Sequence, residues 1–124
     1  MRILLIVTGL IDAAFVAFHI MLGLQMTHWA GVAPPVRGLL EAYNLGSAMT
    51  LAFLGYALLV RGRETLGTGL GAGVLALGTF AFASRALAEF VWLNGNLTIA
   101  AACIALALMH LVLFFGVRVT RPIT

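Results

Sequence analysis

A charged pair lies inside the apolar stretch SRALAEFVW, residues 84–92. Arg85 and Glu89 are four residues apart, and an α-helix places side chains at this spacing next to each other. A guanidinium can hold a carboxylate, or an oxygen of a ligand, through two parallel hydrogen bonds. A carboxyl group beside it can donate or accept a proton. Arg85 and Glu89 are therefore the first candidates for chemistry in this chain.

Further polar side chains are expected at a similar depth. A helix rises 1.5 Å per residue, so His19 and Asn44 lie roughly 25 Å from one common end of the helices, and Glu41 and Arg85 roughly 28 Å. We predict one polar pocket at this depth. Its candidate catalytic residues are His19, Glu41 and Glu89. Its candidate ligand-binding residues are Arg85, Asn44, Tyr43 and Trp92.

A structural interpretation of the same residues stays open beside the pocket. A charge inside a membrane costs at least about 2.5–3.5 kcal/mol, so such a group is paired or lines a wet cavity. Glu41, Arg85 and Glu89 can form an ion-pair network that only sets helix register. The sequence leaves open whether Arg85 pairs with Glu41, with Glu89 or with both.

A second pair is expected nearer the common end of the helices. Asp12 lies at roughly 15 Å and His110 at roughly 10 Å on the same rise per residue. We expect a hydrogen bond between them; a proton path from this pair towards His19 is the alternative. His19 and His110 differ by roughly 15 Å in depth, which argues against a haem with two histidine ligands. No signature spacing indicates a metal site, and no cofactor is identified.

The composition places these residues in a membrane protein. The chain has 124 residues, of which 63% are hydrophobic and 9% charged, and its mean hydropathy is +1.12. A soluble domain is about half apolar and a quarter charged. The length allows one domain. The isoelectric point near 10 does not indicate a nucleic-acid partner, because the arginines lie at helix ends and not in a patch with aromatic residues.

Four apolar runs reach the roughly 20 residues needed to cross a bilayer. The predicted spans are residues 3–25, 39–60, 66–92 and 96–117. Residues 1–17 resemble a signal peptide, but Asp12 interrupts the run, and we expect a retained first span. Residues 60–65 predict a tight charged turn, and Asn96 is placed to cap the last helix. Short connections force antiparallel neighbours, so we predict an all-α, up-down four-helix bundle that forms a single transmembrane domain.

The arginines predict the orientation, because basic residues favour the cytoplasmic side. One side would carry Arg2, Arg61, Arg63, Arg118 and Arg121. Only Arg37 falls on the other side, so both termini should be cytoplasmic. Trp29 and Trp92 would then lie at the outer interface. We expect a multi-pass protein of a cell membrane, the bacterial inner membrane.

The third span is rich in glycine: LGTGLGAGVLALGTF, residues 66–80. Small residues four apart let helices approach closely, which here predicts two packing pairs, Gly67 with Gly71 and Gly69 with Gly73. Steps of seven from Gly71 reach Gly78, Arg85 and Trp92 on one helix face. Arg85 is therefore expected to point into the bundle and not at lipid.

One stretch carries a family resemblance. Residues 41–63, EAYNLGSAMTLAFLGYALLVRGR, resemble the second helix and the following charged turn of the DoxX-like membrane families. The resemblance implies a small four-helix membrane protein, and some members of those families are linked to quinone-coupled redox systems. The Arg85 and Glu89 pair does not match a pattern of those families.

These observations predict a pocket for a lipophilic molecule with a polar head, such as a quinone, an isoprenoid or a sterol-like compound. Arg85 would orient an oxygen, and Glu41 or Glu89 with His19 would handle a proton. The alternatives are an accessory or scaffold subunit of a larger membrane complex and a small proton-coupled transporter. The expected partners are the lipid bilayer, the lipophilic molecule, and further copies of the chain or a larger complex.

Overall fold

The computed structural model describes residues 1–91 and 96–117, and this part of the chain is helical without a strand. The long helices are α1 (Arg2–Met26), α2 (Pro34–Leu59), α4 (Gly69–Val91) and α5 (Leu97–Phe115). A short helix, α3 (Gly62–Gly67), lies between α2 and α4. By length and composition, each of the four long helices could cross a membrane. The prediction of an all-α chain with four apolar spans is confirmed at this level.

Two predicted boundaries were wrong. The second helix begins at Pro34 and not at residue 39, because proline at the first helical position has a suitable φ and lacks an N–H that would be unpaired there. The third span begins at Gly69 and not at residue 66. Thr68 is extended, with φ −130° and ψ 156°, and separates α4 from α3. Most of the predicted charged turn is thus the short helix α3.

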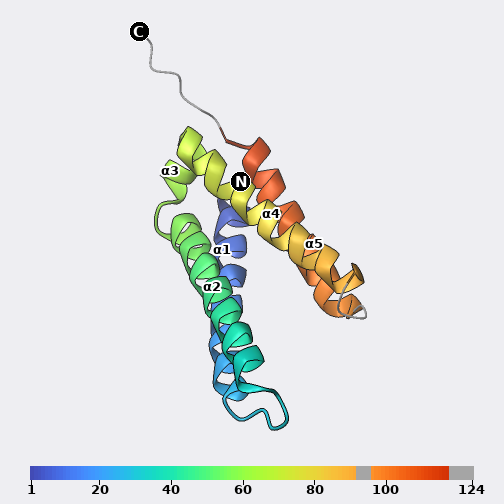
Figure 1. The fold of residues 1–124 in the computed structure, drawn as a ribbon. Coiled ribbons are helices and arrows are strands. Elements are labelled where there is room, and N and C mark those ends of the chain that lie inside the picture. The colour runs from blue at the N-terminus through green and yellow to red at the C-terminus, as the bar shows by residue number, and fades with distance from the viewer. Residues whose placement is uncertain (92–95, 118–124) are drawn as a thin grey trace.

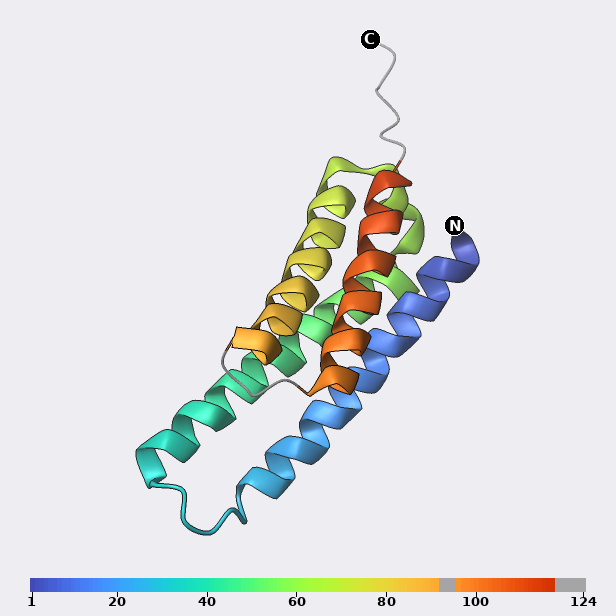
Figure 2. The same ribbon diagram turned by 90° about the vertical axis from the view of Figure 1, so that its right-hand side faces the viewer.

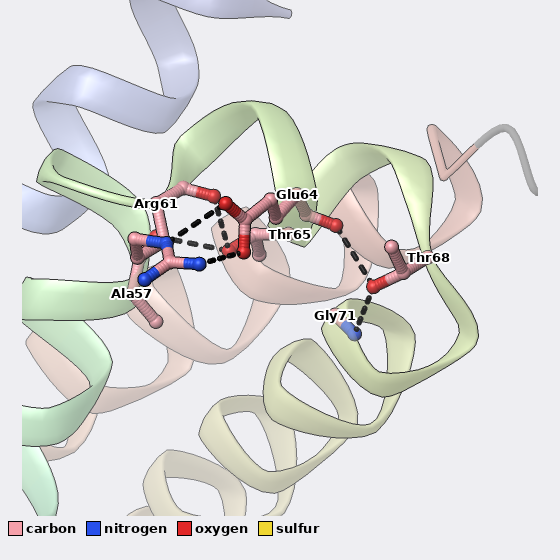
Figure 3. A network of polar contacts seen from close by, with 6 residues as sticks. All are labelled: Ala57, Arg61, Glu64, Thr65, Thr68 and Gly71. Atoms are coloured by element: carbon pink, nitrogen blue, oxygen red, sulfur yellow. Dashed lines mark hydrogen bonds and ion pairs between the residues drawn. The ribbon is translucent and has the colours of Figure 1, made fainter.

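Side-chain hydrogen bonds hold α3 between its neighbours (Figure 3). The hydroxyl of Thr65 donates to the Ala57 carbonyl at 2.9 Å, which ties α3 to α2. The Thr68 hydroxyl donates to a carbonyl of α3 at 2.9 Å and accepts an N–H from the first turn of α4 at 3.0 Å. The ion pair of Arg61 with Glu64 is exposed, and its hydrogen bond raises the pKa of the Arg61 guanidinium.

The long helices form two antiparallel hairpins, α1–α2 and α4–α5 (Figure 1). The hairpins meet at the end that carries α3 and diverge towards the other end. In the turned view, the loop between α1 and α2 extends well past the last turn of α4 and the first turn of α5 (Figure 2). The lower half of the first hairpin is therefore not covered by the second.

The core lies where the hairpins meet. One cluster joins α1, α2, α4 and α5 through Leu5, Leu58, Leu75 and Leu113. A second, larger cluster lies farther from α3 and contains the buried residues Leu51, Leu54, Phe82, Ala86, Cys103, Leu106 and Ala107. Both clusters draw on the two hairpins, so apolar burial holds the hairpins together at this end.

Two of the glycines in the predicted third span lie in close contact with a neighbouring element, and three have open space beside them. A Cβ at Gly71 would lie 2.5 Å from the Thr65 carbonyl carbon, and one at Gly78 would lie 2.7 Å from Nε2 of His110. Gly67, Gly69 and Gly73 have nothing within 4 Å of such a Cβ. The two predicted packing pairs were therefore wrong, because packing follows the single stripe that faces α3 and α5.

Candidate functional site

His19 of α1 and Asn44 of α2 form a doubly hydrogen-bonded pair. Nδ1 of His19 lies 2.7 Å from Oδ1 of Asn44, and Nδ2 of Asn44 donates to the His19 carbonyl at 2.8 Å. The second bond fixes the amide orientation, because a carbonyl only accepts. Oδ1 is then an acceptor, so the proton of a neutral His19 ring is on Nδ1. Nε2 is left as an acceptor, with no hydrogen-bond partner in the described part of the chain.

A groove of about 310 Å³ lies beside this pair. Its lining comes from α1, α2 and the start of their connection: His19, Ile20, Gly23, Leu24, Thr27, Glu41, Asn44, Leu45 and Ala48. Apolar walls with a few polar groups are typical of small-molecule sites. Glu41 is half-buried in the wall, and it is the acidic residue of the lining. The groove thus brings together three of the predicted site residues, His19, Glu41 and Asn44.

Gly23 belongs to this site and was not identified from the sequence. A Cβ at Gly23 would lie 3.0 Å from Nδ2 of Asn44, closer than ordinary packing allows. Gly23 is four residues after His19, so both lie on the α1 face that meets α2. This spacing of histidine and glycine is the signal that was available. Tyr43, in contrast, is 68% exposed and does not line the groove.

Arg85 and Glu89 lie on the other hairpin, within α4. Nη1 of Arg85 is 2.5 Å from Oε1 of Glu89, whose side chain is only 3% exposed. Oε2 of Glu89 accepts the backbone N–H of Asn96 at 3.3 Å. Asn96 caps α5, since its side chain accepts the N–H groups of Thr98 and Ile99, as predicted for a cap. Glu89 therefore joins the end of α4 to the start of α5.

The single pocket predicted from depth is not formed. No residue of α4 or α5 lines the groove at His19, and Arg85 is paired with Glu89 and not with Glu41. The depth estimate assumed parallel spans of equal height, whereas the hairpins diverge at this end (Figure 1). Trp92, the remaining predicted ligand-binding residue, lies outside the described residues.

The predicted neighbours Asp12 and His110 do meet. Nε2 of His110 is 3.3 Å from Oδ2 of Asp12, and both side chains are fully buried. Nδ1 of His110 lies 3.0 Å from the Leu106 carbonyl. The contact does not have hydrogen-bond geometry, and both Asp12 oxygens are without a hydrogen-bond partner in the described part of the chain. The pairing was foreseen, and the expected hydrogen bond was not found.

Within residues 1–91 and 96–117, no group of three or more His, Cys, Asp or Glu side chains is placed to hold a metal ion. Comparisons of the chain with models of protein families, with curated proteins and with solved structures find no match. The site itself is therefore the basis for the function proposed below.

Proposed function

We propose that the α1–α2 groove binds a lipophilic molecule with a polar head, such as a quinone, an isoprenoid or a sterol-like compound. The observation that carries the proposal is the His19–Asn44 pair, because it fixes one tautomer beside an apolar groove. A second groove, of about 420 Å³ between α4 and α5, has no charged side chain in its lining. This second groove has no histidine or charged side chain that could bind a polar head.

The chemistry follows from the fixed tautomer. Nε2 of His19 accepts a hydrogen bond from a hydroxyl of the head group, which a quinone carries in its reduced, quinol form, and Glu41 lies in the same wall. A histidine and a carboxyl group can move a proton on and off an oxygen. The tail lies along Ile20, Leu24 and Leu45, whose burial against it contributes the hydrophobic part of the affinity. Asn44 is a positioning residue, because it acts through His19.

Arg85 and Glu89 are given no ligand role in this proposal. Their contacts are with each other and with the start of α5, and these contacts stabilise the second hairpin. The ligand would reach the groove laterally from lipid, since the second hairpin does not cover this end of the first (Figure 2).

The membrane placement is part of the same proposal. Arg2, Arg61 and Arg63 lie near the end that carries α3, and this end would face the cytoplasm of a bacterial cell. Both termini then lie on that side. Arg37 at the opposite end donates to the Trp29 carbonyl at 2.7 Å, which holds its guanidinium against the loop.

The proposal is tested by native mass spectrometry of the nanodisc-purified protein, followed by lipid extraction. A small molecule should remain bound to the wild type and be lost in His19→Leu and Asn44→Leu. Ala83→Leu, which alters the lining of the second groove, is the matched control and should retain it. Equal retention in all three variants, or an empty wild type with a stoichiometric partner chain, would reject the groove and favour the accessory-subunit alternative.

A further inference from the structure

The Asp12–His110 contact connects the two hairpins. Asp12 lies on α1 and His110 on α5, 3.3 Å apart, and neither side chain is exposed. Among the described residues, it is the contact between two ionisable side chains that joins α1–α2 to α4–α5. It lies among the apolar residues of the core and apart from the groove at His19.

The contacts of His110 determine how many protons the pair holds. The Leu106 carbonyl, 3.0 Å from Nδ1, can only accept, so Nδ1 carries a proton. The contact between Nε2 and Oδ2 of Asp12 is favourable when one further proton lies between them. That proton belongs either to a carboxylic acid facing a neutral imidazole or to an imidazolium facing a carboxylate. Both arrangements have zero net charge.

No other charged group on the helices packed against the pair compensates a change in the number of protons that Asp12 and His110 hold. On α1 the nearest polar neighbour is Thr8, which donates to its own helix. On α2, Gly55 faces Asp12: a Cβ added to Gly55 would lie 3.7 Å from the Cβ of Asp12. The nearest titratable residue of α2 along the chain is Tyr56, whose side chain is 51% exposed.

The second hairpin also offers no free charge. On α4, Gly78 and Phe82 pack against the His110 ring, and the nearest charged residue, Arg85, is paired with Glu89. On α5 the next titratable side chain is Cys103, two turns away. Loss of the shared proton therefore leaves a buried negative charge, and gain of a second leaves a buried positive charge. Either change is costly in an apolar core.

We propose that Asp12 and His110 form a proton-binding site that couples protonation to the docking of the two hairpins. With one shared proton the pair is neutral and the hairpins pack together. When the proton number changes, the uncompensated charge is relieved by admitting water, which requires the hairpins to separate at this contact. The site binds a proton and requires no other ligand, so it does not depend on the proposed function of the groove.

The chain contains its own reporter of separation. Cys103 is the single cysteine of the sequence, is 2% exposed, and lies in the core cluster formed by both hairpins. Its labelling by N-ethylmaleimide in nanodiscs measures the open fraction. The thiol itself reacts faster at higher pH, so each rate is divided by the rate of Asp12→Asn at the same pH. The asparagine amide does not titrate and can donate to Nε2 as the protonated acid does.

The titration covers about pH 5 to about pH 8, where histidine charge changes are centred. The ratio of the wild-type labelling rate to the Asp12→Asn labelling rate should change with pH. It should rise on the order of 100-fold at the pH where the Asp12–His110 pair loses its shared proton or gains a second one. His28→Gln removes a loop histidine and should leave this dependence intact. A ratio that is constant with pH would overturn the proposal.

A second measurement keeps the test decisive if Asp12→Asn does not fold. Infrared difference spectra of the wild type over the same titration should show a carboxyl or imidazole band that changes in step with the labelling rate of Cys103. Bands that change while the labelling stays at the rate expected for thiol ionisation alone would show protonation without separation. That outcome would also overturn the coupling.

Discussion

Replacement of Gly78 by alanine tests how the packing of α4 determines the position of His110. A Cβ at this position would lie 2.7 Å from Nε2 and 2.9 Å from Cγ of the ring, and closer still to Cδ2. Real Cβ atoms essentially never come within 3.0 Å of a heavy atom in this way. The ring is fully buried and packs against Phe82, with 5.5 Å between ring centroids. It therefore cannot move aside as the end of a flexible side chain would.

The expected change in the free energy of unfolding has three parts. Overpacking a core costs about 1–3 kcal/mol. Displacing the ring from Asp12 leaves a buried polar group worse satisfied, at about 1–3 kcal/mol. Alanine in place of glycine returns up to about 1 kcal/mol of helix propensity. We expect a net loss of about 3 kcal/mol, or more than 100-fold in the unfolding constant.

The assay is equilibrium unfolding in mixed micelles, with Gly73→Ala as the matched control. Gly73 lies on the same helix and has nothing within 4 Å of a built Cβ, so its variant should be as stable as the wild type or slightly more stable. In the double variant Gly78→Ala, His110→Ala, the alanine Cβ no longer meets the imidazole ring. The loss of unfolding free energy in the double variant should therefore be smaller than the sum of the losses in the two single variants. If Gly78→Ala is as stable as Gly73→Ala, the close packing of α4 against His110 is wrong.

Three further predictions concern the connections. Thr65→Val removes the 2.9 Å hydrogen bond to the Ala57 carbonyl and should cost about 1 kcal/mol, with faster amide exchange in α3; unchanged exchange would contradict the anchoring. Glu89→Ala leaves Arg85 without its ion pair and should lower the free energy of unfolding by about 2.5–3.5 kcal/mol. Glu89→Gln keeps an acceptor for the Asn96 N–H and should cost less. Equal losses in the two variants would show that the contacts made by the Glu89 oxygens are unimportant. Asn96→Ala removes the cap of α5 and should cost about 1 kcal/mol by thermal unfolding in nanodiscs, with Asn96→Asp as the control that preserves it.

The sequence was sufficient for features that depend on one helix or on adjacent turns. Apolar run length identified the four long helices, and side-chain chemistry identified the cap at Asn96. The i,i+4 spacing identified the Arg85–Glu89 pair. The depth estimate also brought Asp12 to His110, because both lie at the end where the hairpins pack and the spans are nearly level.

The same estimate failed where the helices separate. His19 and Arg85 were predicted at one depth, but the angle between hairpins is set by the packing of many small and large side chains and has no local signature. The groove therefore includes Glu41 and excludes Arg85. The short helix α3 was missed for a related reason: its six residues follow from the hydrogen bonds of Thr65 and Thr68 to the flanking helices.

The division into two hairpins also bears on biosynthesis. Each helix of a hairpin leaves the ribosome directly before or after its main packing partner, so α1 and α2 can pair before α4 has been made. The backbone connects the hairpins only through the segment between Leu59 and Gly69, which includes α3. A chain cut in that segment would still present each hairpin intact, with one member of the Asp12–His110 pair on each fragment. The arrangement of the helices thus allows assembly to follow the order of synthesis.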